Sequence, residues 1–324
     1  MTEPLLSIRG LTTRFRTERG TVTAVDDVSF DVAPGETVAV VGESGSGKSV
    51  TALSILRLIP DPPGRIERGQ ILFEGRDLLT LGDREMRAIR GDRIAMIFQE
   101  PMSSLNPSLT IGLQIAEPVN QHRGAPWSKA LEVARGLLEK VAIPDAAKRL
   151  QTWPHHYSGG MRQRAMIAMA LACQPRLIIA DEPTTALDVT VQAQILDLLK
   201  DLTRETGASL VLITHDLGVV ARYADRVVVM YGGRVVEQAP ARSLYRKPHH
   251  PYTRGLLASV PRLDSVAGEQ LVPIEGSPPD LAALPPGCAF QPRCRWATAA
   301  CSSTRPALRA AAPDHLHACL RDEL

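Results

Sequence analysis

The sequence has few aromatic residues, little net charge and no long apolar run. Aromatic side chains make up 4% of its 324 residues, and its formal net charge is +2. A charge so close to balance neither favours nor excludes a nucleic-acid partner. The longest apolar run, Ala165 to Cys173, is about half as long as a membrane-spanning helix. The first residues show no basic segment followed by an apolar core, so we expect a cytosolic chain without a secretory signal.

Cysteine is also scarce, and its placement is informative. Cys173 stands alone at the end of an apolar segment, which is typical of an inert core residue. The other four follow the pattern C-x5-C-x6-C-x17-C near the end of the chain, and in a reducing compartment such a cluster binds metal more often than it forms disulfides. Four thiolates suit either a 4Fe–4S cluster or tetrahedral zinc, although the paired C-x2-C knuckles of zinc ribbons are absent. The four are Cys288, Cys294, Cys301 and Cys319.

The most informative stretch is a glycine-rich loop that ends in lysine and serine. The apolar residues Thr37–Val41 before it predict a buried strand, and apolar residues at helical spacing follow it. In that setting the backbone N–H groups of the loop and the helix N-terminus point at one place, which predicts a phosphate site. We expect Lys48 to reach the β- and γ-phosphates and Ser49 to ligate Mg²⁺. The candidate nucleotide-binding residues here are Gly42, Glu43, Ser44, Gly45, Ser46, Gly47, Lys48, Ser49 and Val50.

An acidic pair follows the apolar segment Leu177–Ala180, which predicts another buried strand. An aspartate at the end of such a strand is placed to hold Mg²⁺ in a protein with a phosphate loop, so Asp181 is a candidate for that role. Glu182 is then placed to accept a proton from a water molecule that attacks the γ-phosphate. The pair predicts hydrolysis of a nucleoside triphosphate.

Gln99 and His215 each follow a further predicted strand. Because the carboxyl ends of parallel strands meet at one edge of an open α/β sheet, we expect both to lie near Asp181. Gln99 is a candidate to contact Mg²⁺ or the attacking water, and His215 is a candidate sensor of the γ-phosphate.

A second candidate phosphate site lies in the middle of the chain. Ser158, Gly159 and Gly160 come directly before an apolar helical segment, and a helix N-terminus of this kind binds anions. The stretch before it, about residues 100–160, is interrupted by prolines and then shows helical periodicity, so we expect a helical insertion in the α/β domain.

The two ends of the chain complete the predicted architecture. Two alternating segments near the start predict antiparallel strands, and Phe15, in the polar stretch between them, is a candidate to stack on adenine. Gly232-Gly233 is a hairpin signal, after which we expect the sheet to close. Proline and basic residues thicken beyond it, which predicts a boundary between residues 1–245 and residues 246–324.

Together these motifs resemble the ATP-binding subunit of an ABC transporter over residues 5–240. The resemblance implies a P-loop NTPase core of α/β class with an antiparallel β subdomain, an inserted helical subdomain and a small cysteine-containing C-terminal extension. Met161 stands where the commonest form of the signature motif has glutamine. The corresponding motifs are Gly42–Ser49 for Walker A, Gln99 for the Q-loop, Ser158–Gln163 for the signature, Leu177–Asp181 for Walker B, Glu182 for the catalytic base, Asp188 for the D-loop and His215 for the switch histidine.

The resemblance also implies a mechanism and partners. ATP on the phosphate loop of one subunit would be capped by Ser158, Gly159, Gly160 and Asp188 of a second ATPase subunit in a head-to-tail dimer. Hydrolysis would separate the pair and drive two transmembrane permease subunits. In that mechanism Glu182 is the base, Lys48 and His215 neutralise developing charge, and Ser49, Gln99 and Asp181 hold Mg²⁺.

The end of the chain narrows the resemblance to one branch. Pro248–Leu257 and Gly287–Cys294 are similar to the C-terminal extension of dipeptide and oligopeptide importer ATPases, and nickel importers are close relatives of these. The branch implies a 4Fe–4S cluster on the four cysteines, an extracytoplasmic solute-binding protein as partner, and a peripheral location on the cytoplasmic face of the membrane.

Two other functional classes remain open. ABC-type ATPases that act on nucleic acid or the ribosome typically hold two cassettes in one chain, whereas this chain has one, and its basic tail lacks interleaved aromatics. We therefore expect no nucleic-acid partner. A regulatory cassette without hydrolysis would be expected to lose Glu182 or His215, and this sequence keeps both.

Overall fold

The computed structural model describes residues 3–18, 20–185, 187–259 and 273–321. The chain divides into two compact units. The predicted division near residue 245 and the predicted insertion at residues 100–160 stay predictions. The first unit consists of Met1–Ala33, Thr37–Leu79 and Ile213–Leu324, and the second of Pro34–Glu36 and Thr80–Leu212.

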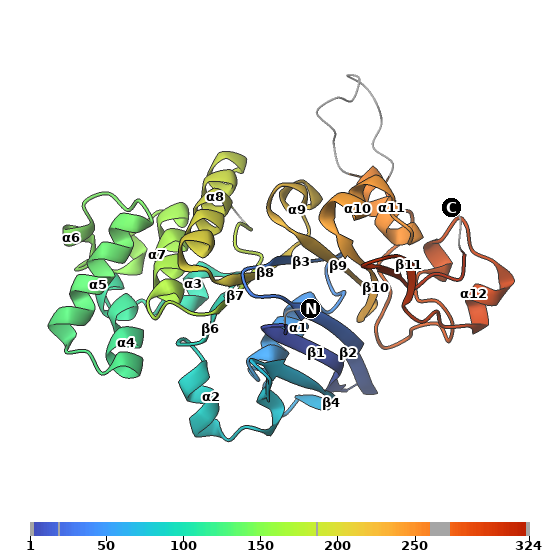
Figure 1. Ribbon diagram of the computed structural model, residues 1–324, viewed down its shortest axis with the longest axis horizontal. Coiled ribbons are helices and arrows are strands. Elements are labelled where there is room, and N and C mark those ends of the chain that lie inside the picture. The colour runs from blue at the N-terminus through green and yellow to red at the C-terminus, as the bar shows by residue number, and fades with distance from the viewer. Residues whose placement is uncertain (1–2, 19, 186, 260–272, 322–324) are drawn as a thin grey trace. The chain divides into compact units, whose positions relative to one another are not determined.

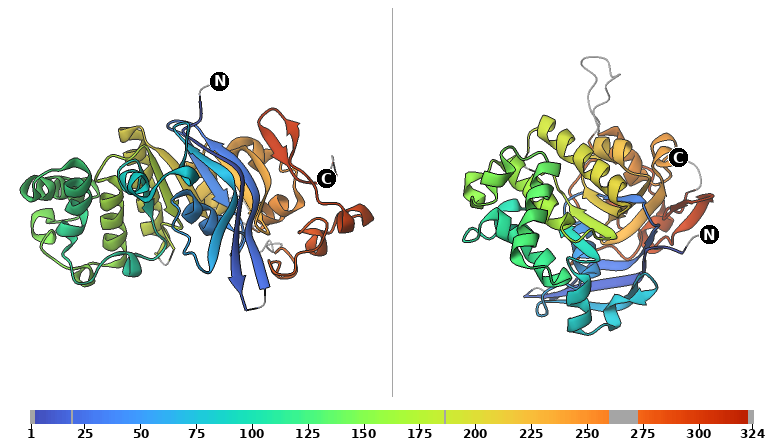
Figure 2. Two further views of the ribbon diagram at one scale, coloured as in Figure 1. Left: turned by 90° about the horizontal axis from the view of Figure 1, so that it is seen from below. Right: turned by 60° about the vertical axis from the view of Figure 1, so that its left-hand side comes forward.

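An antiparallel sheet with the strand order β2-β1-β4-β5 opens the first unit. Figure 2 shows β1 and β2 as a long two-stranded ribbon. The sequence predicted two short strands with a polar stretch between them, but that stretch also alternates in side-chain character and continues the ladder. Phe15 therefore lies inside β1, paired with Val22 on one side and Gly64 on the other. The strands are β1 (Leu6–Thr17), β2 (Gly20–Val32), β4 (Gly64–Phe73) and β5 (Arg76–Asp77).

A second sheet in the first unit has the order β11-β12-β10-β9-β3. β3 is parallel to β9, and β9 joins antiparallel β10 through the Gly232-Gly233 hairpin, as predicted. The expectation that the sheet closes there is wrong, because β12 from the end of the chain pairs with β10 through Glu237–His317 and Gln238–Leu316, and β11 pairs with β12. The strands are β3 (Thr37–Val41), β9 (Arg226–Tyr231), β10 (Arg234–Pro240), β11 (Arg309–Ala312) and β12 (His315–His317).

Residues of the chain's end also enter the hydrophobic core of this unit. Tyr231 of β9, Tyr252 of α11 and Phe290 form a buried aromatic cluster with ring centroids 4.5 to 5.5 Å apart. The extension therefore shares a core with the sheet that carries the phosphate loop. The helices of the unit are α1 (Lys48–Ile55), α9 (Leu217–Tyr223), α10 (Ala241–Arg246), α11 (Pro251–Ala258), α12 (Ala299–Ser303) and the 3₁₀ helices η1 (Leu78–Thr80) and η3 (Gln291–Arg293).

The second unit combines a parallel set of strands with a group of helices. β6 pairs with β7 in parallel, and β7 is followed in the sheet order by β8, whose last two residues belong to the first unit. Figure 1 shows α4, α5, α6 and α7 gathered together. In the part of the chain that the structure describes, no helix is both long and apolar enough to cross a membrane. The elements are α2 (Asp83–Ile89), β6 (Ile94–Ile97), α3 (Pro101–Ser104), α4 (Ile111–Arg123), α5 (Trp127–Lys140), α6 (Ala146–Arg149), η2 (Pro154–His156), α7 (Gly159–Leu171), β7 (Leu177–Asp181), α8 (Val189–Thr206) and β8 (Ser209–Thr214).

Candidate functional site

The glycine-rich loop joins β3 to α1, which is the strand–loop–helix arrangement that the sequence predicted. Two of its glycines have conformations and surroundings that exclude a side chain. Gly42 has φ +152°, and a Cβ there would lie 2.2 Å from the Met230 carbonyl oxygen. Gly47 has φ +101°, and a Cβ there would lie 2.5 Å from the Ala24 carbonyl oxygen. The curl of the loop against its neighbours therefore depends on glycine.

Lys48 and Ser46 give the loop its polar groups. The Lys48 side chain is buried, and its ammonium donates hydrogen bonds to the carbonyl oxygens of Gly42 at 2.8 Å and Glu43 at 3.0 Å. The hydroxyl oxygen of Ser46 is buried and has no hydrogen-bond partner among the residues that the structure describes. Since buried polar groups are normally paired, this hydroxyl fits a loop that receives a polar ligand such as phosphate.

Residues near the end of the chain hold the loop at Glu43. The Glu43 backbone N–H donates to the Tyr252 hydroxyl at 2.7 Å. The two terminal nitrogens of Arg293 donate to the two carboxylate oxygens of Glu43 at 2.7 and 3.0 Å, and this hydrogen bonding raises the pKa of the Arg293 guanidinium. Neither partner was predicted from the sequence, although each lies in a stretch that resembles the importer branch.

In the second unit, the predicted general base is oriented by two donors. The Gln99 side-chain amide donates to Glu182 Oε2 at 3.0 Å, and the Thr185 hydroxyl donates to the same oxygen at 2.9 Å. Glu182 has φ +46°, an uncommon conformation for a residue other than glycine. Asp181 is the buried last residue of β7, as predicted. Thr185 was not predicted, and its spacing of three residues from Glu182 was the available signal.

The helix that the sequence predicts directly after Ser158, Gly159 and Gly160 is present, although it already begins at Gly159. Ser158 is the N-cap of α7 and accepts a hydrogen bond from the Met161 backbone N–H at 3.3 Å. Asp188 is the N-cap of α8 and accepts one from the Val191 backbone N–H at 2.9 Å. Gly159 is the first residue of α7. The role of these residues toward the nucleotide of another subunit stays a prediction.

Gln99, His215 and Phe15 are the remaining predicted site residues. Gln99 follows β6 and His215 follows β8, as predicted. Their expected meeting with Asp181 at one sheet edge stays a prediction, since His215 belongs to the first unit and Gln99 and Asp181 to the second. The stacking of Phe15 on adenine also stays a prediction.

The four cysteines of the extension line one small cavity of about 20 Å³. All are free thiols. Burial raises the pKa of Cys288 to about 11 and also raises the pKa values of Cys294 and Cys319. Their type and common cavity suit a metal cluster, but among the described residues no three histidine, cysteine or acidic side chains are grouped to hold one metal ion. The described residues therefore hold no preformed metal site, and the predicted cluster stays a prediction.

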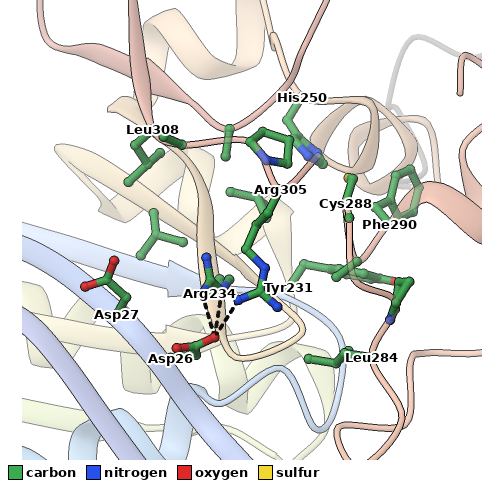
Figure 3. Close-up of a pocket in the computed structure, with 18 of the residues that line it drawn as sticks. Asp26, Asp27, Tyr231, Arg234, His250, Leu284, Cys288, Phe290, Arg305 and Leu308 are labelled. Atoms are coloured by element: carbon green, nitrogen blue, oxygen red, sulfur yellow. Dashed lines mark hydrogen bonds and ion pairs between the residues drawn. The ribbon is translucent and has the colours of Figure 1, made fainter. Parts of the chain in front are cut away.

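A larger cavity of about 410 Å³ lies beside the cysteine cavity within the first unit. Figure 3 shows Asp26 of β2 at its wall, where Arg234 of β10 and Arg305 of the extension both point at its carboxylate. The closest distances to Asp26 Oδ2 are 2.6 Å from Arg234 and 3.3 Å from Arg305. This ion-pair group links the antiparallel sheet, the second sheet and the extension.

Comparison with known proteins identifies the family of this chain. A family model described as ABC transporter matches residues 25–185, and one described as oligopeptide/dipeptide transporter, C-terminal region, matches residues 236–301. A putative peptide import ATP-binding protein of Brucella melitensis is 54% identical to this chain over 98% of this chain and 97% of its own length. The dipeptide transport ATP-binding protein DppD of Bacillus subtilis is 51% identical over 99% of this chain and 96% of its own length. Among solved structures, the dimeric ATP-binding cassette MJ0796, in a post-hydrolysis state with ADP and Pi, matches with a TM-score of 0.66 at 30% identity over 73% of this chain and 99% of that one.

The chain belongs to the ATP-binding proteins of the ABC transporter family. Within that family, its C-terminal region matches the oligopeptide and dipeptide transporters, as the sequence predicted. The predicted ABC ATPase core of α/β class is confirmed by the structural match, and the predicted class of enzyme, an ATPase, is confirmed by the family.

Proposed function

We propose that this chain is the ATP-hydrolysing subunit that energises an importer of dipeptides or oligopeptides. One observation carries this proposal. The same chain has a phosphate loop with a buried lysine, Lys48, and a C-terminal region that matches the oligopeptide/dipeptide transporters. The match of that region also favours transport over an ATPase that acts on nucleic acid. Nickel import by the same branch is the alternative that the experiment below separates.

The residue roles follow from chemistry and position. The phosphate loop binds the ATP phosphates through its backbone N–H groups, with Lys48 and the unpaired Ser46 hydroxyl as side-chain donors. Ser49, Gln99 and Asp181 supply oxygen ligands of the kind that Mg²⁺ prefers, and the bound ion would neutralise phosphate charge. Glu182, held by Gln99 and Thr185, takes the proton of the attacking water. His215 would donate to the γ-phosphate.

The proposal includes a second ATPase subunit, identical or paralogous. Ser158, Gly159, Gly160 and Asp188 would close on the nucleotide of that partner, because the backbone N–H groups and the dipole of a helix N-terminus, such as that of α7, favour an anion. The structurally similar cassette MJ0796 is dimeric with ADP and Pi, which supports such an arrangement. The further proposed partners are two permease subunits and an extracytoplasmic solute-binding protein, with this chain peripheral on the cytoplasmic face.

Uptake measurements test the proposal. In a strain of the source organism that lacks this chain, the wild-type chain is expected to restore uptake of a radiolabelled dipeptide, and the Glu182→Gln variant is expected to fail. The complex purified on this chain should contain two permease proteins. Restored uptake of ⁶³Ni²⁺ without dipeptide uptake would replace peptide by nickel, and a chain that purifies without permease proteins would contradict the transporter assignment.

We propose as a separate point that Cys288, Cys294, Cys301 and Cys319 hold a 4Fe–4S cluster, with zinc as the alternative. The support for this proposal is that the four thiols line one cavity. Because metal ligation needs thiolates, binding of the cluster would release protons and draw the sulfur atoms together. Protein purified without oxygen is expected to be brown, to absorb near 400 nm, and to contain about four iron atoms and four sulfides per chain. Cys294→Ser should lose the colour, whereas Cys173→Ser, outside the cavity, should keep it. Colourless protein with stoichiometric zinc would favour the alternative.

A further inference from the structure

Two residues of the C-terminal extension, Tyr252 and Arg293, form hydrogen bonds with Glu43 of the phosphate loop. Tyr252 bonds to the main chain of Glu43, and Arg293 bonds to its side chain. The Tyr252 hydroxyl accepts a hydrogen bond from the backbone N–H of Glu43, so that group is directed at the extension. Arg293 binds the Glu43 carboxylate with both terminal nitrogens, a geometry that fixes orientation as well as distance. These contacts cross 209 and 250 positions of sequence.

Glu43 in turn holds the interior of the loop. Its carbonyl oxygen accepts a hydrogen bond from the Lys48 ammonium at 3.0 Å and another from the Ser46 backbone N–H at 3.2 Å. The position of Glu43 therefore sets the positions of the two residues that are proposed to contact the phosphates. A shift of the extension would move the loop at this residue.

Arg293 and Tyr252 are themselves held in place by their neighbours. The Arg293 side chain is 6% exposed, and its guanidinium lies 5.9 and 6.0 Å from the ring centroids of Tyr231 and Phe290. Its Nε donates to the Glu275 carbonyl oxygen at 2.9 Å. Tyr252 is fully buried in the same aromatic cluster. Desolvation offsets much of what a buried ion pair adds to stability, so the main effect of this pair is on geometry.

We infer that Arg293 and Tyr252 are positioning residues for ATP binding, which hold Glu43 and through it Lys48. The inference rests on the proposed role of the phosphate loop as the ATP site. The C-terminal extension thereby contributes to the binding of ATP at that site. Loss of the contacts of Arg293 and Tyr252 with Glu43 lowers the affinity for ATP, and it leaves the base Glu182 unchanged.

The test compares full-length variants by binding of a fluorescent ATP analogue and by steady-state hydrolysis. Arg293→Met is expected to raise the Kd and the KM for ATP at least fivefold and to change kcat less than threefold. Arg293→Lys should recover part of the loss, since it keeps the charge without the two-nitrogen contact. The matched control is Arg295→Met, because Arg295 lies two positions further along the chain, is exposed and stacks on Trp296.

Two further variants keep the test decisive if Arg293→Met does not fold. Glu43→Gln and Tyr252→Phe keep the size of their side chains, and each is expected to raise the Kd. In a double-mutant cycle, Glu43→Gln with Arg293→Lys should bind no more weakly than the weaker single variant, because both remove one interaction. The inference would be overturned if the two single substitutions changed the binding free energy independently and additively, or if all of these variants had the same Kd as Arg295→Met. Either result would leave the proposed ATP site standing. A wild-type chain that binds no ATP analogue would overturn the proposed site together with the inference.

Discussion

The side chains of Gln99 and Glu182 are joined by a hydrogen bond of 3.0 Å, although 83 positions separate them in the chain. With the Thr185 hydroxyl on the same oxygen, two donors fix the direction of the Glu182 carboxylate. A base that takes a proton from water needs such orientation, because proton transfer depends on hydrogen-bond geometry before it depends on pKa.

Removing the charge of Glu182 tests its role as the base. Glu182→Gln keeps the shape of the side chain but cannot take a proton, so the rate of ATP hydrolysis is expected to fall at least about a hundredfold. ATP should still bind, and the variant should accumulate as an ATP-bound dimer in size-exclusion chromatography. Phosphate release measures the rate. Turnover equal to wild type would remove Glu182 from this role.

The Thr185 hydroxyl tests whether orientation of the base affects the rate. Thr185→Val removes the donor with little change of shape, and kcat is expected to fall about three- to tenfold with the KM for ATP unchanged. Thr206→Val is the control, since the Thr206 hydroxyl donates to the carbonyl oxygens of Leu202 and Thr203 in its own helix α8. Equal kcat values for the two variants would show that Gln99 alone is sufficient to orient Glu182.

Ser158 has a structural role as N-cap and a proposed role at the partner's nucleotide, and two substitutions separate them. Ser158→Ala should lower the free energy of unfolding by about 1 kcal/mol through loss of the cap, and should also lower hydrolysis at least tenfold. Ser158→Asn keeps a good capping side chain, so it should restore stability but not hydrolysis. If Ser158→Asn hydrolyses ATP at the wild-type rate, Ser158 is a cap and nothing more. Urea unfolding and phosphate release are the two measurements.

Glu237 of β10 predicts a pH dependence of stability. Burial alone raises the pKa of this carboxyl, but hydrogen bonds from the His315 ring and from the His249 and His250 backbone N–H groups outweigh it and leave the pKa below its ordinary value of 4.5. The ionised form therefore stabilises the native state, fully above pH 4.5, and this contribution is lost as the pH falls through the native pKa.

The matching substitution is Glu237→Gln. At pH 7 it should lower the free energy of unfolding by about 2 kcal/mol, because hydrogen bonds to a charged acceptor become bonds to a neutral one. The difference from wild type should shrink as the pH falls from 6 to 3, and urea unfolding across that range measures it. A difference that is constant with pH would show that the charge of Glu237 does not stabilise the fold.

Local patterns were sufficient to predict the parts of the site that depend on neighbouring residues. The apolar runs Thr37–Val41 and Leu177–Asp181 are strands, and the helix that begins at Gly159 starts where Ser158 caps it. Each is specified within a few residues by strand apolarity or capping chemistry. These strands and this helix could therefore be predicted from local sequence, whereas the ABC core was implied by the resemblance of the motifs to a known family.

The sequence did not predict how the extension attaches to the core. The pairing of β12 with β10 and the contact of Arg293 with Glu43 join segments that are far apart in sequence, and no local period encodes such partners. Glu237, a buried acid in an apolar strand, was the residue that signalled a polar partner from elsewhere, because a buried carboxylate needs one.

The three-residue turn η3, which ends in Arg293, lies between Cys288 and Cys294, and both thiols face the cysteine cavity. The segment from Cys288 to Cys294 thus lines the thiol cavity with its two cysteines and contacts the phosphate loop through the side chain of Arg293. Thermodynamic reciprocity then applies: a ligand of the thiols that changes ATP affinity by some factor must have its own affinity changed by ATP by that same factor.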